Sequence, residues 1–148
     1  MVYLNQAITL KMKTKITVEC TINSTIEKVW KSWTTPEDIV KWNFASEDWY
    51  APKAINDLTV GGKFVYTMSS KDGSMSFDFY GNYTEILLYK SIKYHTGDDR
   101  AVSIEFIENG SSVQIIETFE AEDENPIEMQ RFGWQAILDN FKKHAESL

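Results

Sequence analysis

The 148-residue sequence is poor in cysteine, in basic charge and in long apolar runs, and each shortage excludes a class of protein. Cys20 is the only cysteine, so no disulfide can form within the chain, which fits a reducing cytoplasm. The 22 acidic and 15 basic side chains give a net charge of −7 without a basic tract, so we expect no nucleic-acid partner. No apolar run approaches the roughly 20 residues of a membrane span, and residues 1–10 lack the features of a signal peptide. The sequence therefore predicts a cytoplasmic protein with no membrane span.

Signatures of metal and covalent chemistry are also missing. The only two histidines, His95 and His144, stand far apart without metal-ligand spacing. The pair Gly61-Gly62 is followed by a strand pattern and lacks the Lys-Ser or Lys-Thr of a phosphate loop. No serine is flanked by glycines as a nucleophile would be. We expect no metal, no cofactor and no catalytic residue that the sequence alone identifies.

Aromatic and apolar side chains are abundant, at 14% and 43% of the chain. This composition excludes disorder and predicts one full hydrophobic core. A single domain over residues 1–148 is expected. The regular pattern begins only at Lys15, so residues 1–12 are interpreted as a loose N-terminal extension or an ordinary frayed terminus.

Alternating apolar and polar residues predict a series of strands. Residues 15–22 alternate cleanly and place Cys20 on the apolar face, where a small core residue is expected rather than a nucleophile. Further strands are predicted at 49–55, 63–69, 76–86, 90–95, 100–108 and 111–121. The dipeptide Asn109-Gly110 is a strong hairpin signal, and sequential hairpins predict an antiparallel meander.

The sequence also contains three helix starts, two after the first strand and one after the last. Ser24 and Glu27 have the spacing of a capping box before a short helix, and Thr35-Pro36 begins a second helix expected to end near Trp42. Asn125-Pro126 opens a last helix of about 20 residues, or roughly 30 Å. We predict an α+β fold in which a curved sheet of six or seven strands wraps around this C-terminal helix, with room for a ligand between them.

Candidate binding residues come from the apolar stripes of the strands and the last helix. Such side chains either line a ligand pocket or fill an ordinary core, and the sequence leaves both interpretations open. The predicted ligand-binding set is Trp49, Tyr66, Phe77, Phe79, Phe106, Glu117, Trp134 and Ile137. A glycine inside a helix lowers its stability by about 1 kcal/mol, so Gly133 beside Trp134 indicates a packing or cavity requirement there.

Glu117 is the outstanding polar candidate because it is in phase with Ile115 and Phe119 and should point inward. An inward carboxylate is unfavourable unless it is paired or hydrogen-bonded. It could orient a ligand hydroxyl or act as a general base. The alternative is a position at the rim, or an ion pair with Arg100 or Arg131.

A set of motifs spread over the chain resembles a known family. The motifs are Val29-Trp30-x-x-Trp33-Thr34-x-Pro36, Trp42, Val60-Gly61-Gly62-Lys63-Phe64, Gly81-x-Tyr83-x-Glu85 and Gly133-Trp134. In order and spacing, from Lys13 to about His144, they resemble the family named for its similarity to the activator of the heat-shock protein 90 ATPase. That family belongs to the START-related helix-grip (SRPBCC) superfamily. The chain looks like a bacterial single-domain member.

This resemblance implies a curved sheet that encloses an apolar cavity against the C-terminal helix. Superfamily members bind lipids, sterols, plant hormones or polyketides, and a few are cyclases or other enzymes. The co-chaperone that gives the family its name carries an additional N-terminal domain, for which this sequence has no space. Activation of a chaperone is therefore not the expected function.

Three functional hypotheses follow. The first is a non-enzymatic protein that binds an apolar or amphipathic small molecule through the eight residues above. The second is a cyclase, dehydratase or hydrolase that uses the same cavity, with Glu117 joined by Tyr66 or Asp78. The third is a protein-interaction module, which a solid interior and an exposed apolar patch would favour. Homodimerisation is left open by the sequence.

Overall fold

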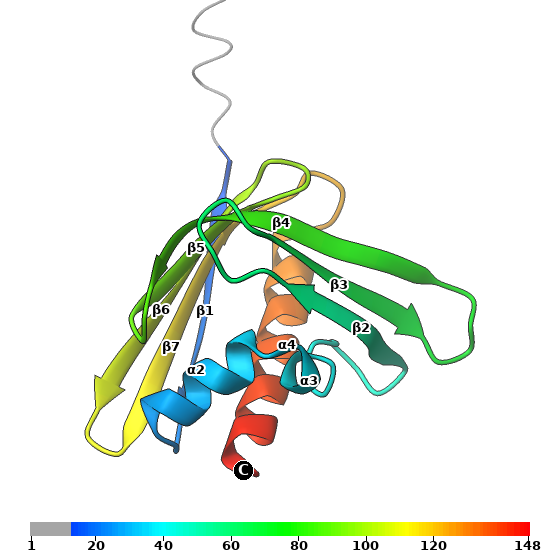
Figure 1. The fold of residues 1–148 in the computed structure, drawn as a ribbon. Coiled ribbons are helices and arrows are strands. Elements are labelled where there is room, and N and C mark those ends of the chain that lie inside the picture. Colours follow the sequence, from blue (N-terminus) through cyan, green and yellow to red (C-terminus); the bar gives the residue numbers. More distant parts are fainter. Residues whose placement is uncertain (1–12) are drawn as a thin grey trace, which may run out of the picture.

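The computed structural model describes residues 13–148, so the interpretation of residues 1–12 lies outside the described residues. Ten elements follow one another within residues 13–148 (Figure 1). They are β1 (Lys15–Ile22), α2 (Ile26–Thr34), α3 (Pro36–Ile39), β2 (Trp49–Asn56), β3 (Lys63–Ser70), β4 (Ser76–Leu87), β5 (Ser91–Thr96), β6 (Ala101–Asn109), β7 (Ser112–Glu120) and α4 (Ile127–Glu146).

The seven strands form one antiparallel sheet in the order β1-β7-β6-β5-β4-β3-β2. Six strands follow the chain as a meander, and β1 joins the far edge beside β7. Figure 1 shows the sheet curving over α4, with α2 and α3 on the same concave side. The predicted fold class, a curved antiparallel sheet around a long C-terminal helix, is confirmed.

Strand register explains which side chains reach the concave face. One row across β1, β7, β6 and β5 consists of Ile16, Phe119, Val102 and Tyr94. The next row consists of Val18, Glu117, Ile104 and Ile92. Every member of both rows is buried, because successive side chains on a strand alternate between the faces. Glu117 follows the same alternation, so its carboxylate lies on the apolar concave face.

The predicted helix caps need correction. Thr25, not Ser24, is the N-cap of α2, and its hydroxyl accepts a hydrogen bond from the backbone nitrogen of Lys28 at 3.3 Å. Thr35 precedes α3 without a side-chain cap, and α3 ends at Ile39 rather than near Trp42. Pro126, not Asn125, is the N-cap residue of α4. In each case the sequence places the helix start within one or two residues, where local hydrogen bonding decides the cap.

Helix α3 and the segment between α3 and β2 both contact the last helix. Nε2 of His144 lies 2.8 Å from Oδ1 of Asp38, and the Asn140 amide donates to the carbonyl of Phe44 at 2.7 Å. The indole of Trp42 donates to the carbonyl of Ser32 at 3.0 Å, which joins the same segment to α2. These contacts hold α3 and the segment after it against α2 and α4.

Candidate ligand cavity

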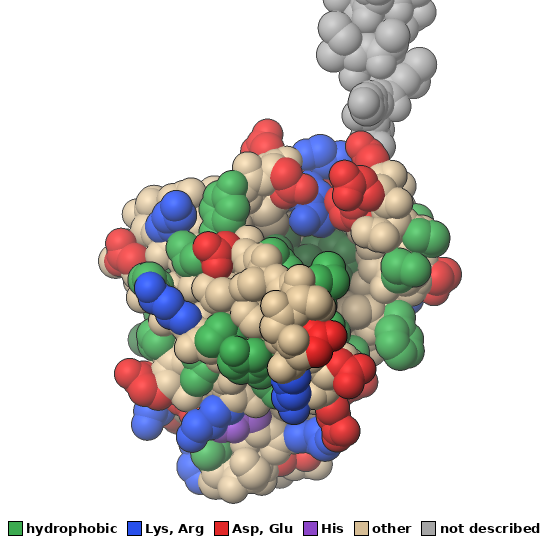
Figure 2. All heavy atoms as spheres, turned by 90° about the vertical axis from the view of Figure 1, so that its right-hand side faces the viewer, with side chains coloured by type: hydrophobic (Ala, Val, Ile, Leu, Met, Phe, Trp, Pro, Cys, Tyr) green, Lys and Arg blue, Asp and Glu red, His purple; other side chains and the backbone are tan. Residues whose placement is uncertain are grey.

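A cavity of about 430 Å³ lies between α4, the strands β3–β5 and the segment after α3. Figure 2 shows the opening as a deep hollow with hydrophobic side chains in its walls and charged side chains at its rim. Eleven of the 23 residues that line it are aromatic. The aromatic side chains that line it are Trp33, Trp42, Phe44, Trp49, Phe64, Tyr66, Phe77, Phe79, Tyr83, Tyr94 and Trp134.

Contacts between the rings fix this wall. Trp134 on α4 stacks on Phe119 of β7, with the ring centroids 3.9 Å apart, and meets the edge of Phe79 at 5.9 Å. Phe64 and Tyr94 meet edge to face at 4.7 Å. Each such pair adds about 0.5–1.5 kcal/mol to stability beyond the contribution of apolar burial. These contacts therefore stabilise the positions of the rings around the cavity.

Gly133 opens the wall on the helix side. A β-carbon built on Gly133 would meet no heavy atom within 4 Å, and the residue lines the cavity. Of the two reasons that the sequence suggested, close packing and a cavity, the structure thus supports the cavity. A side chain here would project into free space rather than into a neighbouring element.

Glu117 is a buried acid that faces the same space. Its side chain lines the cavity, and the residue is only 6% exposed. No residue from 13 to 148 forms a hydrogen bond or ion pair with its carboxylate, and burial raises its pKa to about 8. The carboxyl group is therefore largely protonated at neutral pH and can exchange its proton near that pH.

The arginines that sequence analysis offered as partners of Glu117 are engaged elsewhere. Arg100 donates to Asp98 at 2.8 Å and to the backbone carbonyl of Glu120 at 3.3 Å. Arg131 lies 3.3 Å from Glu128 and donates to the carbonyl of Thr17 at 3.1 Å. The alternatives of a rim position and an arginine pair for Glu117 therefore do not describe this structure.

Two buried tyrosines share the cavity with Glu117. Burial raises the pKa of Tyr66 and of Tyr94 well above the ordinary value, so both hydroxyls stay neutral. Tyr94 and Glu117 lie in adjacent rows on the concave face, and the charge of Glu117 adds to the upward shift of the Tyr94 pKa. A third tyrosine, Tyr83, donates to Oδ1 of Asn56 at 2.5 Å. The cavity thus combines apolar walls with a small number of polar groups.

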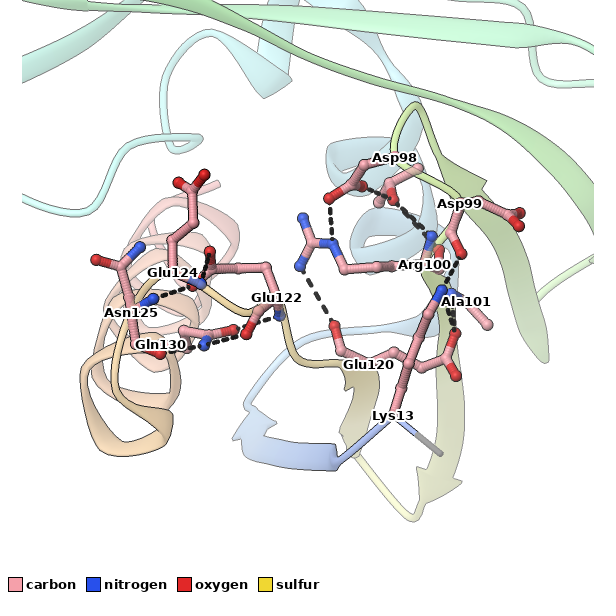
Figure 3. A network of polar contacts seen from close by, with 11 residues as sticks. Lys13, Asp98, Asp99, Arg100, Ala101, Glu120, Glu122, Glu124, Asn125 and Gln130 are labelled. Atoms are coloured by element: carbon pink, nitrogen blue, oxygen red, sulfur yellow. Dashed lines mark hydrogen bonds and ion pairs between the residues drawn. The ribbon is translucent and has the colours of Figure 1, made fainter. Parts of the chain in front are cut away.

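A polar network forms one side of the mouth (Figure 3). The buried side chain of Gln130 accepts from the backbone nitrogen of Glu122 at 3.0 Å and donates to the carbonyls of Glu122 and Asn125. Figure 3 shows Arg100 with Asp98 and Glu120 across from this loop. The contacts of Gln130 fix the turn that leads from β7 into α4, and hence the position of Gly133 and Trp134.

The structure places seven of the eight predicted ligand-binding residues around one cavity: Trp49, Tyr66, Phe77, Phe79, Glu117, Trp134 and Ile137. The eighth, Phe106, is outside it, because the indoles of Trp30 and Trp33 cover its ring at centroid distances of 5.2 and 5.8 Å. Sequence analysis missed Tyr94, Gln130 and Arg100 as lining residues. The alternation of Ile92 and Tyr94 could have indicated the first, whereas no sequence signal marks the other two.

The architecture defines a class of protein, the helix-grip fold, in which a curved sheet and a C-terminal helix enclose an internal space. Within that class the chain belongs to the family described as Activator of Hsp90 ATPase homolog 1-like protein, whose model matches residues 23–146. The family resemblance seen in the sequence is confirmed. No curated protein matches the chain.

Solved structures agree with this assignment. An AHSA1-like protein from Aeromonas hydrophila is 40% identical, with a TM-score of 0.86 over 90% of this chain and 93% of that one. Chr148 from Cytophaga hutchinsonii is 50% identical, with a TM-score of 0.78 over 90% and 92% of the two chains. NE0264 from Nitrosomonas europaea, at 18% identity and a TM-score of 0.78 over 90% and 94%, shares the fold.

None of the helices within residues 13–148 is long and apolar enough to cross a membrane. Nor do these residues contain a group of three or more histidine, cysteine, aspartate or glutamate side chains placed to hold a metal ion.

Proposed function

We propose that the chain is a small-molecule binding protein that holds an apolar or amphipathic ligand between α4 and the sheet. The observation that carries the proposal is a preformed cavity of about 430 Å³ with aromatic walls around one buried acid. Sites for small molecules typically measure about 300–1,000 Å³ and combine apolar walls with a few polar groups. A solid interior would instead have favoured a protein-interaction module.

The proposed ligand contacts are the seven predicted residues that line the cavity. Burial of apolar ligand surface supplies about 25 cal/mol per Å², and the polar groups at Glu117, Tyr66 and Tyr94 set the orientation. Trp49 and Phe77 meet edge to face at 5.8 Å, and Phe77 is half exposed, so this pair would close over a bound molecule at the mouth. With its single cysteine, the chain is proposed to work in the cytoplasm.

A thermal-shift screen of lipids, aromatic polyketides and flavonoids tests this proposal. A ligand at 100 times its dissociation constant adds about 2.7 kcal/mol of stability, which raises the Tm by about 5–10 °C for a domain of this size. Native mass spectrometry of protein purified without additives would detect a ligand that co-purifies.

The matched variants are Gly133→Leu, which places a side chain in the cavity, and Phe132→Leu, which puts the same residue on the solvent face one position earlier. We expect Gly133→Leu to abolish the ligand-induced shift and Phe132→Leu to retain it. Equal shifts in the two variants would show that ligands bind elsewhere, and the proposal would fail.

An enzyme that uses the same cavity is a second candidate, favoured by the convergence of Glu117, Tyr66 and Tyr94. A carboxyl group with a pKa of about 8 suits proton transfer near neutral pH. Asp78, the other predicted partner, lies outside on an exposed position and accepts a hydrogen bond from Thr67 at 2.7 Å. In Glu117→Gln, a binding protein keeps its affinity for an uncharged apolar ligand, whereas an acid–base enzyme loses turnover.

A further inference from the structure

Building on the proposed function, we infer that the ligand is a hydrophobic amine, held with its ammonium group beside the carboxylate of Glu117 and its apolar body against the aromatic wall. The starting observation is an acid that is more than nine-tenths buried, faces an open cavity and has no partner among residues 13–148. A buried charge of this kind becomes favourable when a counter-ion is present, and the cavity has space for a ligand to supply one.

Within the described residues 13–148, the groups around Glu117 offer it no counter-charge. Tyr66 on β3 and Tyr94 on β5 are neutral, and so is Cys20 on β1, because burial raises the pKa of its thiol to about 12. The cavity-facing residues of α4 are uncharged: Gln130, Gly133, Trp134 and Ile137. At the rim, Arg100 pairs with Asp98, and Glu122 adds a further negative charge. A cation at this position must therefore come with the ligand.

Aromatic walls suit a cation as well as an apolar body. The faces of aromatic rings carry negative electrostatic potential and attract ammonium groups within about 6 Å. Tyr94 lies one row from Glu117 on the concave face and lines the cavity, so an aromatic ring borders the site near the acid.

The charges at the mouth of the cavity also favour a positively charged ligand. Two acidic segments border it: Glu47 and Asp48 lie between the lining residues Ser46 and Trp49, and Glu122 to Glu124 precede the lining residue Asn125. Figure 2 shows acidic side chains around the hollow. Together with the net charge of −7, this field attracts cations and repels carboxylates.

Calorimetric titration with three probes that share one apolar frame tests the inference: 2-naphthylmethylamine, 2-naphthylmethanol and 2-naphthoate. At pH 8 and low salt we expect the amine to bind the unmodified protein at least tenfold more tightly than the alcohol, and the carboxylate to bind most weakly. Glu117→Gln should remove the preference for the amine and keep the affinity for the alcohol, which also shows that the cavity is intact. Glu105→Gln removes the same charge from an exposed position on β6 and should behave like the unmodified protein.

The pH dependence gives an independent readout. The empty acid, with a pKa of about 8, must lose its proton to accept the ammonium group. The affinity for the amine should therefore rise by up to tenfold per pH unit from pH 6 to 8, while that for the alcohol stays flat.

Equal affinities of the amine and alcohol, or an amine preference that survives Glu117→Gln, would overturn the inference but leave the proposed function standing, provided that Gly133→Leu still blocks the probes. Binding by none of the three would contradict the proposed function itself.

Discussion

Replacing Glu117 by glutamine should stabilise the folded protein, by an amount that depends on pH. In the folded chain, burial raises the pKa of Glu117 to about 8 from an ordinary value of 4.5. A difference of about 3.5 pH units, at about 1.4 kcal/mol each, corresponds to about 5 kcal/mol of stability that is lost when the buried carboxyl group ionises. Glutamine has nearly the same shape and does not ionise, so the variant avoids this loss.

The sign of this pH dependence follows because the folded state binds the proton of Glu117 more tightly than the unfolded state does. Because the folded state has the higher pKa, the contribution of Glu117 is fully present below pH 4.5 and falls as the pH rises to about 8. Urea denaturation at pH 5, 6, 7 and 8 should show Glu117→Gln gaining on the unmodified protein by about 1 kcal/mol per pH unit, or about 3 kcal/mol in all.

The exposed variant Glu105→Gln serves as the control for a general change in net charge and should give a nearly constant difference. A stability difference between Glu117→Gln and the unmodified protein that does not vary over this pH range would refute the reasoning. It would mean that the carboxylate is solvated or paired, and the amine inference would lose its premise as well.

Three further predictions concern other parts of the site. Gly133→Ala should raise the free energy of unfolding by about 1 kcal/mol, measured by urea denaturation, because alanine favours the helix and its β-carbon meets free space. Gln130→Ala should lower it by about 1–3 kcal/mol, since a backbone N–H and two carbonyls lose their partner; unchanged stability would contradict the role of Gln130 in the turn. Cys20 is half-buried and its thiol pKa is raised to about 12, so it should react with a disulfide reagent at pH 8 more slowly in the folded protein than after unfolding, and equal rates would contradict the raised pKa.

The strands could be predicted from the sequence because half-buried strands show alternation and tight hairpins show their turn residues. Asn109-Gly110 is an example: Gly110 adopts a φ of +64°, which the turn between β6 and β7 requires. The pairing of β1 with β7 joins residues about 100 positions apart and leaves no local signal. No partner for the first strand was therefore predicted from the sequence.

The cavity was harder to predict than the fold, because the same alternation serves a filled core and a hollow one. Phe79 and Phe106 both lie on the concave side of the sheet, yet Phe79 borders free space and Phe106 lies under two indoles of α2. The difference lies in what covers each ring, which depends on how α2 docks and not on the strand that carries the ring. Arg100 reaches the rim through a turn, and its partners depend on that turn's three-dimensional shape.

Two local departures from the rules of stable packing coincide in this cavity. A glycine inside α4 forgoes helix stability, and an acid on β7 that has no partner in the described part of the chain opposes burial, yet both line the same cavity. Neither departure is required by the fold, because alanine and glutamine would fit at the two positions. Sequences that are otherwise consistent with their fold tend to break such rules where function demands it. The joint position of Gly133 and Glu117 therefore supports the proposed binding of a ligand over an accident of imperfect packing.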